Sequence, residues 1–289
     1  MDTAGLLAFV AVADTQSFSQ AAQRLFLTQS AVSKRIALLE SQLECRLFDR
    51  IGRQVILTEA GNRLLPRARE ILHAIEDAEQ MIKDSDGEVN GRLTLAASHH
   101  ISLHRMPPIL KAFIQQYPNV ELDLRFAASE VAYEGVLKGD FELALITLAP
   151  EADERILART LWSDRLQYVI SRAHPLALQP RTSLNELNRY PAILPGIDTF
   201  THQRVRQHLA LQELEPNLGM STDNLDTIRM MVSVGLGWSL LPETMIDDSL
   251  CCLDTGTEPV YRPLGYIHHR NRTLSNAARE LLSMLPEAV

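Results

Sequence analysis

The first sixty residues place apolar side chains at the spacing of short helices. Ser17 is a suitable N-cap for a second helix and Thr28 for a third. Only Phe26 and Leu27 lie between the second helix and the Thr28 cap, and so short a turn between two helices is typical of a helix-turn-helix. The apolar positions of the three predicted helices are Leu6, Leu7, Phe9, Val10 and Ala13, then Ala21, Ala22 and Leu25, then Val32, Ile36, Leu39 and Leu43.

A hairpin and a long helix are predicted next. Residues from Phe48 to Leu57 form a strand-turn-strand with Ile51-Gly52-Arg53 at its tip, which is the expected wing. Thr58-Glu59-Ala60-Gly61 begins a helix whose apolar residues alternate spacings of four and three, a heptad pattern that predicts a dimer interface. The alternative is that this helix packs only on its own domain. The heptad residues are Leu64, Ala68, Ile71, Ile75, Ala78 and Ile82.

From Arg92 onward, strand patterns alternate with helix patterns, which implies parallel sheets with helices on both faces. We expect two similar doubly wound subdomains, joined by strands that cross near Leu161-Trp162 and near Pro263-Leu264. The predicted strands are Leu93–Ala96, Val120–Phe126, Phe141–Thr147, Leu166–Ser171, Ala192–Leu194, Trp238–Leu241 and Tyr266–His269. The predicted helices are Met106–Tyr117, Val131–Lys138, Thr201–Leu211, Ile228–Val234 and Leu274–Leu285.

These patterns predict a multidomain fold. Residues 1–58 are expected to form the winged helix-turn-helix, 59–88 the linker helix and 92–289 an α/β sensor domain. In the sensor, residues 92–161 with 266–289 form the first subdomain and residues 162–265 the second. The length of 289 residues agrees with more than one domain, because it exceeds what a single hydrophobic core ordinarily supports.

The charge of the chain is unevenly distributed. The formal net charge is −8, which by itself argues against a nucleic-acid partner. Between Arg24 and Arg53, however, six basic residues stand against Glu40, Glu44 and Asp49. DNA phosphates respond to such a local basic face rather than to the net charge.

The chain shows no sign of export or of a membrane segment. No apolar run approaches the roughly 18 residues of a membrane span. The apolar start carries Asp2 and lacks a basic stretch, so we expect a cytoplasmic protein. Cys45 is isolated and Cys251 adjoins Cys252, which is not a metal-ligand spacing. We expect reduced thiols and no cofactor, with a redox sensor as the alternative.

The third predicted helix carries side chains suited to reading bases. Gln can pair with adenine, Arg or Lys with guanine, and Ser with either, when the N-terminal end of such a helix enters the major groove. On the wing, Arg50 and Arg53 are expected to contact phosphates or the minor groove. The candidates on the helix are Gln29, Ser30, Ser33, Lys34 and Arg35.

Several segments together resemble the LysR-type transcriptional regulators. The most specific are residues 17–25 and 28–36, followed by Leu47-Phe48-Asp49-Arg50 and Leu57-Thr58-Glu59-Ala60-Gly61. His174-Pro175-Leu176-Ala177 and residues 234–243 resemble that family's sensor domain. The resemblance implies dimers formed through the linker helix, usually assembled into tetramers. It also implies a sensor like a periplasmic binding protein, whose effector changes how the tetramer bends promoter DNA.

The partners implied by this resemblance are double-stranded promoter DNA, a small-molecule effector and, for an activator, RNA polymerase. Carried over by position, Gln29, Ser30, Ser33 and Lys34 would read the groove, and Arg53 would be the wing contact. Two positions depart from the family. Glu44 replaces the usual Gly after the recognition helix, where a left-handed backbone would cost a non-Gly residue roughly 1 kcal/mol. Glu142 replaces an Asp in the sensor.

Candidate effector residues follow the predicted strands, because ligands of doubly wound sheets lie beyond the carboxyl ends of strands. We expect a small anionic metabolite there. Alternatives stay open: Ser98 is only a helix cap, the His99-His100 pair is solvated in a loop, or these two rings bind a metal with His104 and His202. The candidates are Ser98, His99, His100, Ser129, Thr147, Thr199, His202 and Thr222.

The sequence gives less support to two other functions. A solute-binding protein of the periplasm would have a signal peptide and no winged helix. An enzyme would be expected to show a motif such as G-x-S-x-G, a P-loop or H-E-x-x-H, and the sequence contains none of them.

Overall fold

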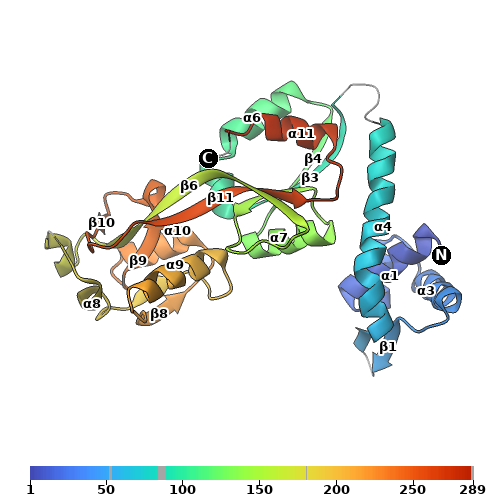
Figure 1. Ribbon diagram of the computed structural model, residues 1–289, viewed down its shortest axis with the longest axis horizontal. Helices are drawn as coiled ribbons and strands as arrows, with labels where there is room; N and C mark the ends of the chain where they lie inside the picture. Colours follow the sequence, from blue (N-terminus) through green and yellow to red (C-terminus); the bar gives the residue numbers. More distant parts are fainter. Residues whose placement is uncertain (52–53, 84–88, 180, 288–289) are drawn as a thin grey trace. The chain divides into compact units, whose positions relative to one another are not determined.

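The computed structural model describes residues 1–51, 54–83, 89–179 and 181–287, which belong to two compact units, Met1–Gly87 and Glu88–Val289 (Figure 1). The predicted fold class is confirmed: a helical winged helix-turn-helix and a long helix are followed by an α/β domain. Across these described ranges, no helix combines the length and apolarity needed to cross a membrane.

The first unit consists of three short helices, a two-stranded antiparallel sheet and one long helix. Ser17 and Thr28 accept hydrogen bonds from the backbone N–H groups of Gln20 and Ala31, so the predicted caps fix where two helices begin. The elements are α1 (Thr3–Thr15), α2 (Phe18–Arg24), α3 (Gln29–Leu43), β1 (Phe48–Ile51), β2 (Gln54–Leu57) and α4 (Glu59–Lys83).

One apolar core orients these helices. Fully burying a large aliphatic or aromatic side chain stabilises a fold by roughly 1.5–3 kcal/mol, so this core holds α3 firmly against α1. The rings of Phe9 and Phe48 lie 5.4 Å apart and connect α1 to the wing. The buried residues include Leu6, Phe9, Val12, Phe18, Val32, Ile36, Leu39, Leu47, Phe48, Ala68 and Leu72.

Polar contacts fix the path from α3 into the wing and α4. The carboxylate of Glu40 accepts hydrogen bonds from the N–H groups of Leu47 and Phe48, at 2.7 and 3.3 Å. Thr58 Oγ1 accepts from the Gly61 N–H at 3.0 Å at the start of α4. Glu44 ends α3 with φ 52°, so this departure from the family does hold a left-handed backbone.

The long helix α4 has a core contact that its heptad pattern does not reveal. Ala68 and Leu72 are buried in the core of the first unit, and Leu64 packs against it. The first half of this helix therefore packs on its own domain, and the dimer interface stays a prediction. Ile71 is 37% exposed and Ile75 is half-buried.

The second unit is built on a mixed sheet with strand order β10-β6-β11-β5-β3-β4 among the described residues, with β9 paired to β6. Its strands are β3 (Gly91–Ala97), β4 (Val120–Phe126), β5 (Leu143–Thr147), β6 (Ile156–Ser171), β9 (Ser239–Pro242), β10 (Leu250–Cys252) and β11 (Val260–His269). A separate parallel pair consists of β7 (Ala192–Leu194) and β8 (Leu218–Ser221).

Two long antiparallel strands, β6 and β11, run from one lobe of this unit into the other (Figure 1). Their register pairs Leu264 with Trp162, so the two predicted crossing points are neighbours. The expected parallel pairs are present between β3 and its neighbours β4 and β5, but the crossing strands add antiparallel pairs and make the sheet mixed.

Helices cover both faces of the sheet in each lobe. In the first lobe, α6 and α11 pack on β3 on one face and α7 packs on β5 on the other. In the second lobe, α9 and α10 cover opposite faces in the same way. The helices are α5 (His99–His104), α6 (Pro107–Gln116), α7 (Ser129–Lys138), η2 (Pro175–Leu178), α8 (Leu184–Leu187), α9 (Phe200–Leu211), α10 (Leu225–Ser233), η3 (Glu243–Met245) and α11 (Asn276–Ser283).

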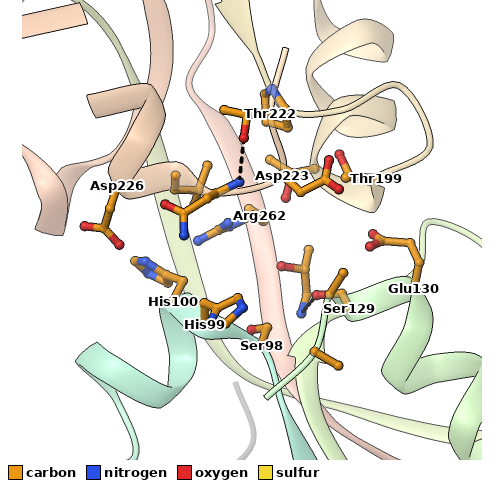
Figure 2. Close-up of a pocket in the computed structure, with 17 residues that line it drawn as sticks. Ser98, His99, His100, Ser129, Glu130, Thr199, Thr222, Asp223, Asp226 and Arg262 are labelled. Carbon is orange, nitrogen blue, oxygen red and sulfur yellow. Dashed lines mark hydrogen bonds between the residues drawn. The ribbon is translucent and has the colours of Figure 1, made fainter. Parts of the chain in front are cut away.

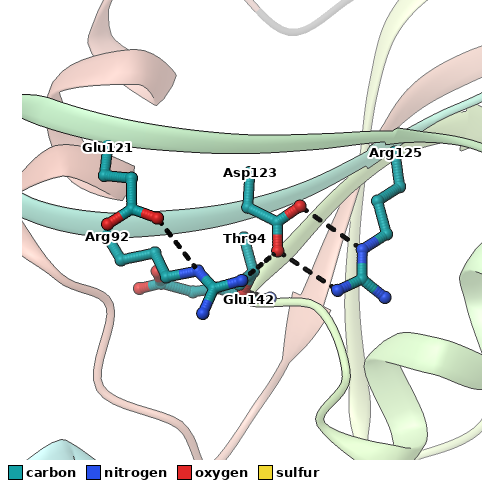
Figure 3. Close-up of polar contacts among 6 residues, drawn as sticks. All are labelled: Arg92, Thr94, Glu121, Asp123, Arg125 and Glu142. Carbon is teal, nitrogen blue, oxygen red and sulfur yellow. Dashed lines mark hydrogen bonds and ion pairs between the residues drawn. The ribbon is translucent and has the colours of Figure 1, made fainter.

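Glu142, the second departure from the family, is buried and connects β5 to α11. Its carboxylate accepts hydrogen bonds from the N–H and Oγ of Ser275 at 2.6 and 3.1 Å. The Glu142 N–H also donates a hydrogen bond to Thr94 Oγ1 at 3.0 Å. Figure 3 shows Asp123 of β4 between Arg92, on the adjacent β3, and Arg125, on its own strand. Hydrogen bonds from both arginines lower the pKa of Asp123.

Candidate nucleic-acid interface and ligand cavity

The face of α3 opposite its core contacts carries most of the predicted base-reading residues. Gln29, Ser30 and Lys34 are exposed and Ser33 is half-exposed. Ser19 donates a hydrogen bond to Gln29 Oε1 at 3.1 Å, which orients that side chain from the neighbouring helix. The structure therefore brings four candidates together near the N-terminal end of α3.

The remaining DNA candidates are placed differently. Arg35 follows Ser33 by two residues, which is roughly 200° around a helix, so it lies on the opposite flank of α3. Arg50 belongs to β1, but its side chain lies outside the described part of the structure, as does Arg53 altogether. The wing contacts stay predictions.

A cavity of about 380 Å³ lies between the two lobes of the second unit (Figure 2). It is bounded by the N-terminal ends of α5, α7 and α10, by the loop before α9, and by β11. Seven of the eight predicted effector residues line it: Ser98, His99, His100, Ser129, Thr147, Thr199 and Thr222.

His202 is the predicted residue outside this lining. Its Nδ1 lies 2.8 Å from the carbonyl oxygen of Pro195, and the ring is buried within its own lobe. Two other members of the alternative metal set have different neighbours: His99 stacks on Phe126, and His100 contacts Asp164. The ring of His104 lies 4.8 Å from that of His100.

Ser98 has an unpartnered hydroxyl. It occupies the N-cap position of α5, yet its side chain makes no capping hydrogen bond. The residue is 8% exposed, and its Oγ has no hydrogen-bond partner among the described residues. A buried polar atom without a partner costs about 1–3 kcal/mol, so this hydroxyl is suited to a ligand rather than to capping.

Beside the cavity lies a buried ionic cluster centred on Asp164. Its Oδ2 accepts a hydrogen bond from Arg262 at 2.8 Å and lies 3.0 Å from His100 Nε2, and its Oδ1 accepts from Arg105 at 2.9 Å. Burial alone would raise the pKa of Asp164, but the contacts with His100 and Arg262 hold it below its usual range. Burial lowers the pKa of His100, because the charged ring would lose its hydration.

This cluster excludes, for His100, the alternative that the His99-His100 pair is solvated in a loop. Both residues begin the short helix α5, where His99 is exposed and His100 is 7% exposed. Arg262 is 2% exposed, contributes to the cavity lining, and has an Nε with no described hydrogen-bond partner. Sequence reasoning missed Arg262, although a charged residue in a predicted crossing region was the available signal.

Three acidic residues also line the cavity and were not predicted: Glu130, Asp223 and Asp226. Glu130 Oε1 accepts a hydrogen bond from the Phe200 N–H at 2.6 Å, which links α7 of one lobe to α9 of the other. The two aspartates lie at the start of α10. The cavity therefore combines buried donors with carboxylates.

The cysteines give the redox alternative little support. Cys45, Cys251 and Cys252 are unbridged, and burial raises the pKa of Cys252, which lowers the reactive thiolate fraction.

Two family models match the chain. One, described as the LysR substrate binding domain, covers residues 86–289, and one, described as a bacterial regulatory helix-turn-helix protein of the lysR family, covers residues 4–62. Together they account for both units of the structure.

Curated relatives agree with these matches. YeiE, an uncharacterized HTH-type transcriptional regulator of Escherichia coli K12, is 31% identical over 95% of this chain and 93% of its own length. The transcriptional activator CmpR of Synechocystis is 29% identical over 96% of this chain and 92% of its own. An uncharacterized HTH-type regulator of Azotobacter vinelandii is 64% identical over 37% of this chain and 75% of its own.

Solved structures share the fold. Full-length OxyR from Pseudomonas aeruginosa, a variant form, has a TM-score of 0.73 at 20% identity and covers 98% of this chain and 93% of its own. Full-length CbnR bound to its target DNA has a TM-score of 0.62 at 21% identity and covers 99% of each chain. The effector-binding domain of QuiR with shikimate has a TM-score of 0.62 at 18% identity, over 68% of this chain and 95% of its own.

Proposed function

The chain belongs to the LysR family of DNA-binding transcriptional regulators, and we propose that a small anionic metabolite in its cavity controls how it binds promoter DNA. The family is not enzymatic, so the cavity serves to sense a ligand and not to transform it. The observation that carries the proposal is the cavity itself, in which a buried Ser98 hydroxyl and the Arg262 Nε both lack hydrogen-bond partners among the described residues.

For DNA, we assign base reading to Gln29, Ser30, Ser33 and Lys34, and phosphate contacts to Arg35, Arg50 and Arg53. The exposed N-terminal end of α3 supports the first group. CbnR, which shares this fold, is found with its target DNA, and that agrees with a DNA-binding role for the first unit. Since promoter DNA is the proposed partner, the cytoplasm is the proposed location.

For the effector, the proposed contacts are Ser98, His99, His100, Ser129, Thr147, Thr199 and Thr222, with Arg262 added from the structure. A hydroxyl and a guanidinium are suited to a carboxylate or phosphate. QuiR, whose effector-binding domain shares the fold, is found with shikimate, and that agrees with a small ligand in such a domain. His202 is no longer proposed as a direct contact, because Pro195 occupies its Nδ1.

For assembly, we propose a dimer through α4 and a tetramer of two dimers, with RNA polymerase as a further partner if the protein activates. Partly exposed Ile71 and Ile75 on α4 support the dimer. The proposed domains remain 1–58, 59–88 and 92–289, with lobes of 92–161 plus 266–289 and of 162–265.

The DNA-binding role is tested by fluorescence anisotropy with the intergenic DNA upstream of the gene. The regulator should bind it specifically, with affinity falling steeply as salt rises. Ser33→Ala should weaken binding to this DNA by roughly 1 kcal/mol, or about fivefold, and change binding to random DNA much less. Equal losses on both DNAs would contradict a base-reading role for Ser33.

The effector role is tested by footprinting the same DNA with fractions of a bacterial metabolite extract. One fraction should change the footprint of the wild-type protein and not that of Ser98→Ala, whose footprint without extract should match the wild type. If no fraction changes the wild-type footprint, the proposed control by a metabolite fails.

A further inference from the structure

Carboxylates outnumber arginine and lysine side chains among the described residues that line the cavity. Glu130, Asp223 and Asp226 contribute three carboxylates, whereas Arg262 is the one arginine or lysine among the lining residues described. The buried Asp164 already pairs with the Arg262 guanidinium at 2.8 Å. An effector with negative charge alone would thus meet several carboxylates at short range without enough positive charge to balance them.

Two of the three lining carboxylates have no partner. Glu130 is engaged by the Phe200 N–H, but Asp223 and Asp226 make no hydrogen bond or ion pair with any described part of the chain. Gly196 makes room for Asp223, because a Cβ at position 196 would collide with its carboxylate oxygen. Acidic residues early in a helix also offset its dipole, which gives Asp226 a structural role, whereas Asp223 is exposed and precedes the Asn224 cap.

The same cavity supplies donors that also lack partners. The Ser98 Oγ and the Arg262 Nε are buried, and neither has a hydrogen-bond partner in the described ranges. Figure 2 shows Ser98 beside the starts of α5 and α7, and Asp223 and Asp226 apart from each other, on either side of Arg262. Within one cavity, therefore, the donors for an anion come from both lobes, Ser98 from the first and Arg262 from the second, and the unpartnered carboxylates come from the second.

We propose that the effector is a small zwitterion of the α-amino acid class. Its carboxylate binds at Ser98 and Arg262, and its ammonium group binds at one of the two aspartates, Asp223 or Asp226, which lie on either side of Arg262 in Figure 2. The inference rests on the proposed function, because it specifies the second charge of the effector of that same cavity. The volume of about 380 Å³ is near the lower end of known ligand sites, which suits a metabolite of amino-acid size.

A zwitterion would also couple binding to the arrangement of the lobes. Its carboxylate contacts α5 and β11, while its ammonium group contacts the start of α10 in the second lobe. A ligand that bears only one charge engages one of these sets. The zwitterion therefore favours the arrangement in which both sets face each other, which is the differential affinity that a ligand-driven switch requires.

The test is isothermal titration calorimetry on the full-length protein with the twenty common L-amino acids, each compared with its matched single-charge compounds. For leucine these are 4-methylpentanoate, which lacks the amine, and 3-methylbutylamine, which lacks the carboxylate. At least one amino acid should bind with a Kd below about 1 mM, and both of its matched compounds should bind at least about tenfold more weakly.

Variants then separate the two ends of the ligand. Asp223→Asn or Asp226→Asn, whichever removes the partner of the ammonium group, should weaken the amino acid by about tenfold without weakening its deaminated acid, whereas Ser98→Ala should weaken both. Asp248→Asn removes the same charge from an exposed position in the same lobe and should leave binding unchanged. Urea unfolding followed by tryptophan fluorescence checks that each variant is folded.

The inference is overturned if none of the twenty amino acids binds, if the deaminated acid binds as tightly as its amino acid, or if both aspartate variants keep wild-type affinity. The proposed function fails separately. If the protein prefers the deaminated acid and Ser98→Ala abolishes that binding, the proposed function stands although the zwitterion does not. The proposed function fails if no extract fraction alters the DNA footprint.

Discussion

Glu44 is a single residue whose backbone conformation lowers the stability of the first unit by a measurable amount. Its left-handed backbone costs a non-glycine residue about 1 kcal/mol. Glu44→Gly should therefore raise the free energy of unfolding of the first unit by roughly 0.5–1 kcal/mol, reduced somewhat by the freer unfolded chain. Hydrogen exchange of the α1 and α3 amides measures this, because Trp162 and Trp238 both lie in the second unit. Gln42→Gly, on the exposed face of α3, is the matched control and should lower the same free energy by about 1 kcal/mol; similar losses in both variants would contradict the strain.

A second residue, Asp164, is predicted to stabilise the second unit by neutralising Arg262. Asp164→Asn leaves the buried guanidinium of Arg262 without its counter-charge, and breaking a buried pair in this way costs about 3–5 kcal/mol. Arg105→Gln, which removes a more exposed partner of the same carboxylate, should cost clearly less. Urea unfolding followed by tryptophan fluorescence measures both. A loss for Asp164→Asn no larger than that for Arg105→Gln would show that Arg262 does not depend on this carboxylate.

Among whole elements, α4 packs on its own unit through Leu64, Ala68 and Leu72, while Ile71 and Ile75 belong to the proposed dimer seam. Ile75→Asp should break the proposed dimer and lower the mass in solution, because a carboxylate would be buried in that seam. Light scattering coupled to size-exclusion chromatography measures the mass. Arg63→Asp is the control: this exposed residue lies off the heptad positions and should leave the mass unchanged. A wild-type mass for Ile75→Asp would exclude the seam as an interface.

The elements that the sequence predicts well are those marked locally. Ser17 and Thr28 cap their helices as expected, because a cap and its N–H partner lie three residues apart. By contrast, β6 begins at Ile156, ten residues before the predicted strand, since its half-buried start is defined by pairing with β11 rather than by an apolar run. The six-residue helix α5 was likewise missed, because so short a helix shows no periodicity.

The candidate site follows the same division. Ser98, Ser129 and Thr147 were predictable, because each lies at or just beyond the carboxyl end of a strand, where ligands of doubly wound sheets usually bind. Arg262 and its partner Asp164 were not, because they are 98 positions apart and meet only through the register of the two crossing strands. The acidic side of the cavity also escaped prediction, since aspartates near the start of a helix have an ordinary structural explanation.

For the molecule as a whole, buried histidines should determine how stability depends on pH near neutrality. Burial lowers the pKa of His100, His174, His208 and His268, all in the second unit. The unfolded chain therefore binds more protons than the native chain once the pH falls to about 6.5. When the pKa of a histidine is lower in the native chain than in the unfolded chain, the native state has its full stability above the unfolded-state pKa. That stability is lost as the pH falls toward the native-state pKa. The free energy of unfolding of this unit should thus decline between pH 7.5 and 5.5.

Urea unfolding followed by tryptophan fluorescence across this range tests the prediction. Each such histidine contributes at most about 1.4 kcal/mol per pH unit. Carboxylates contribute little here, because unfolded Asp and Glu titrate near pH 4, so the decline belongs to the histidines. His208→Gln should make the slope shallower, since His208 is half-buried beside Tyr168 and its neutral form is the native one. A free energy of unfolding that stays flat or rises toward pH 5.5 would contradict the prediction. An unchanged slope in His208→Gln would show that His208 does not contribute to the decline.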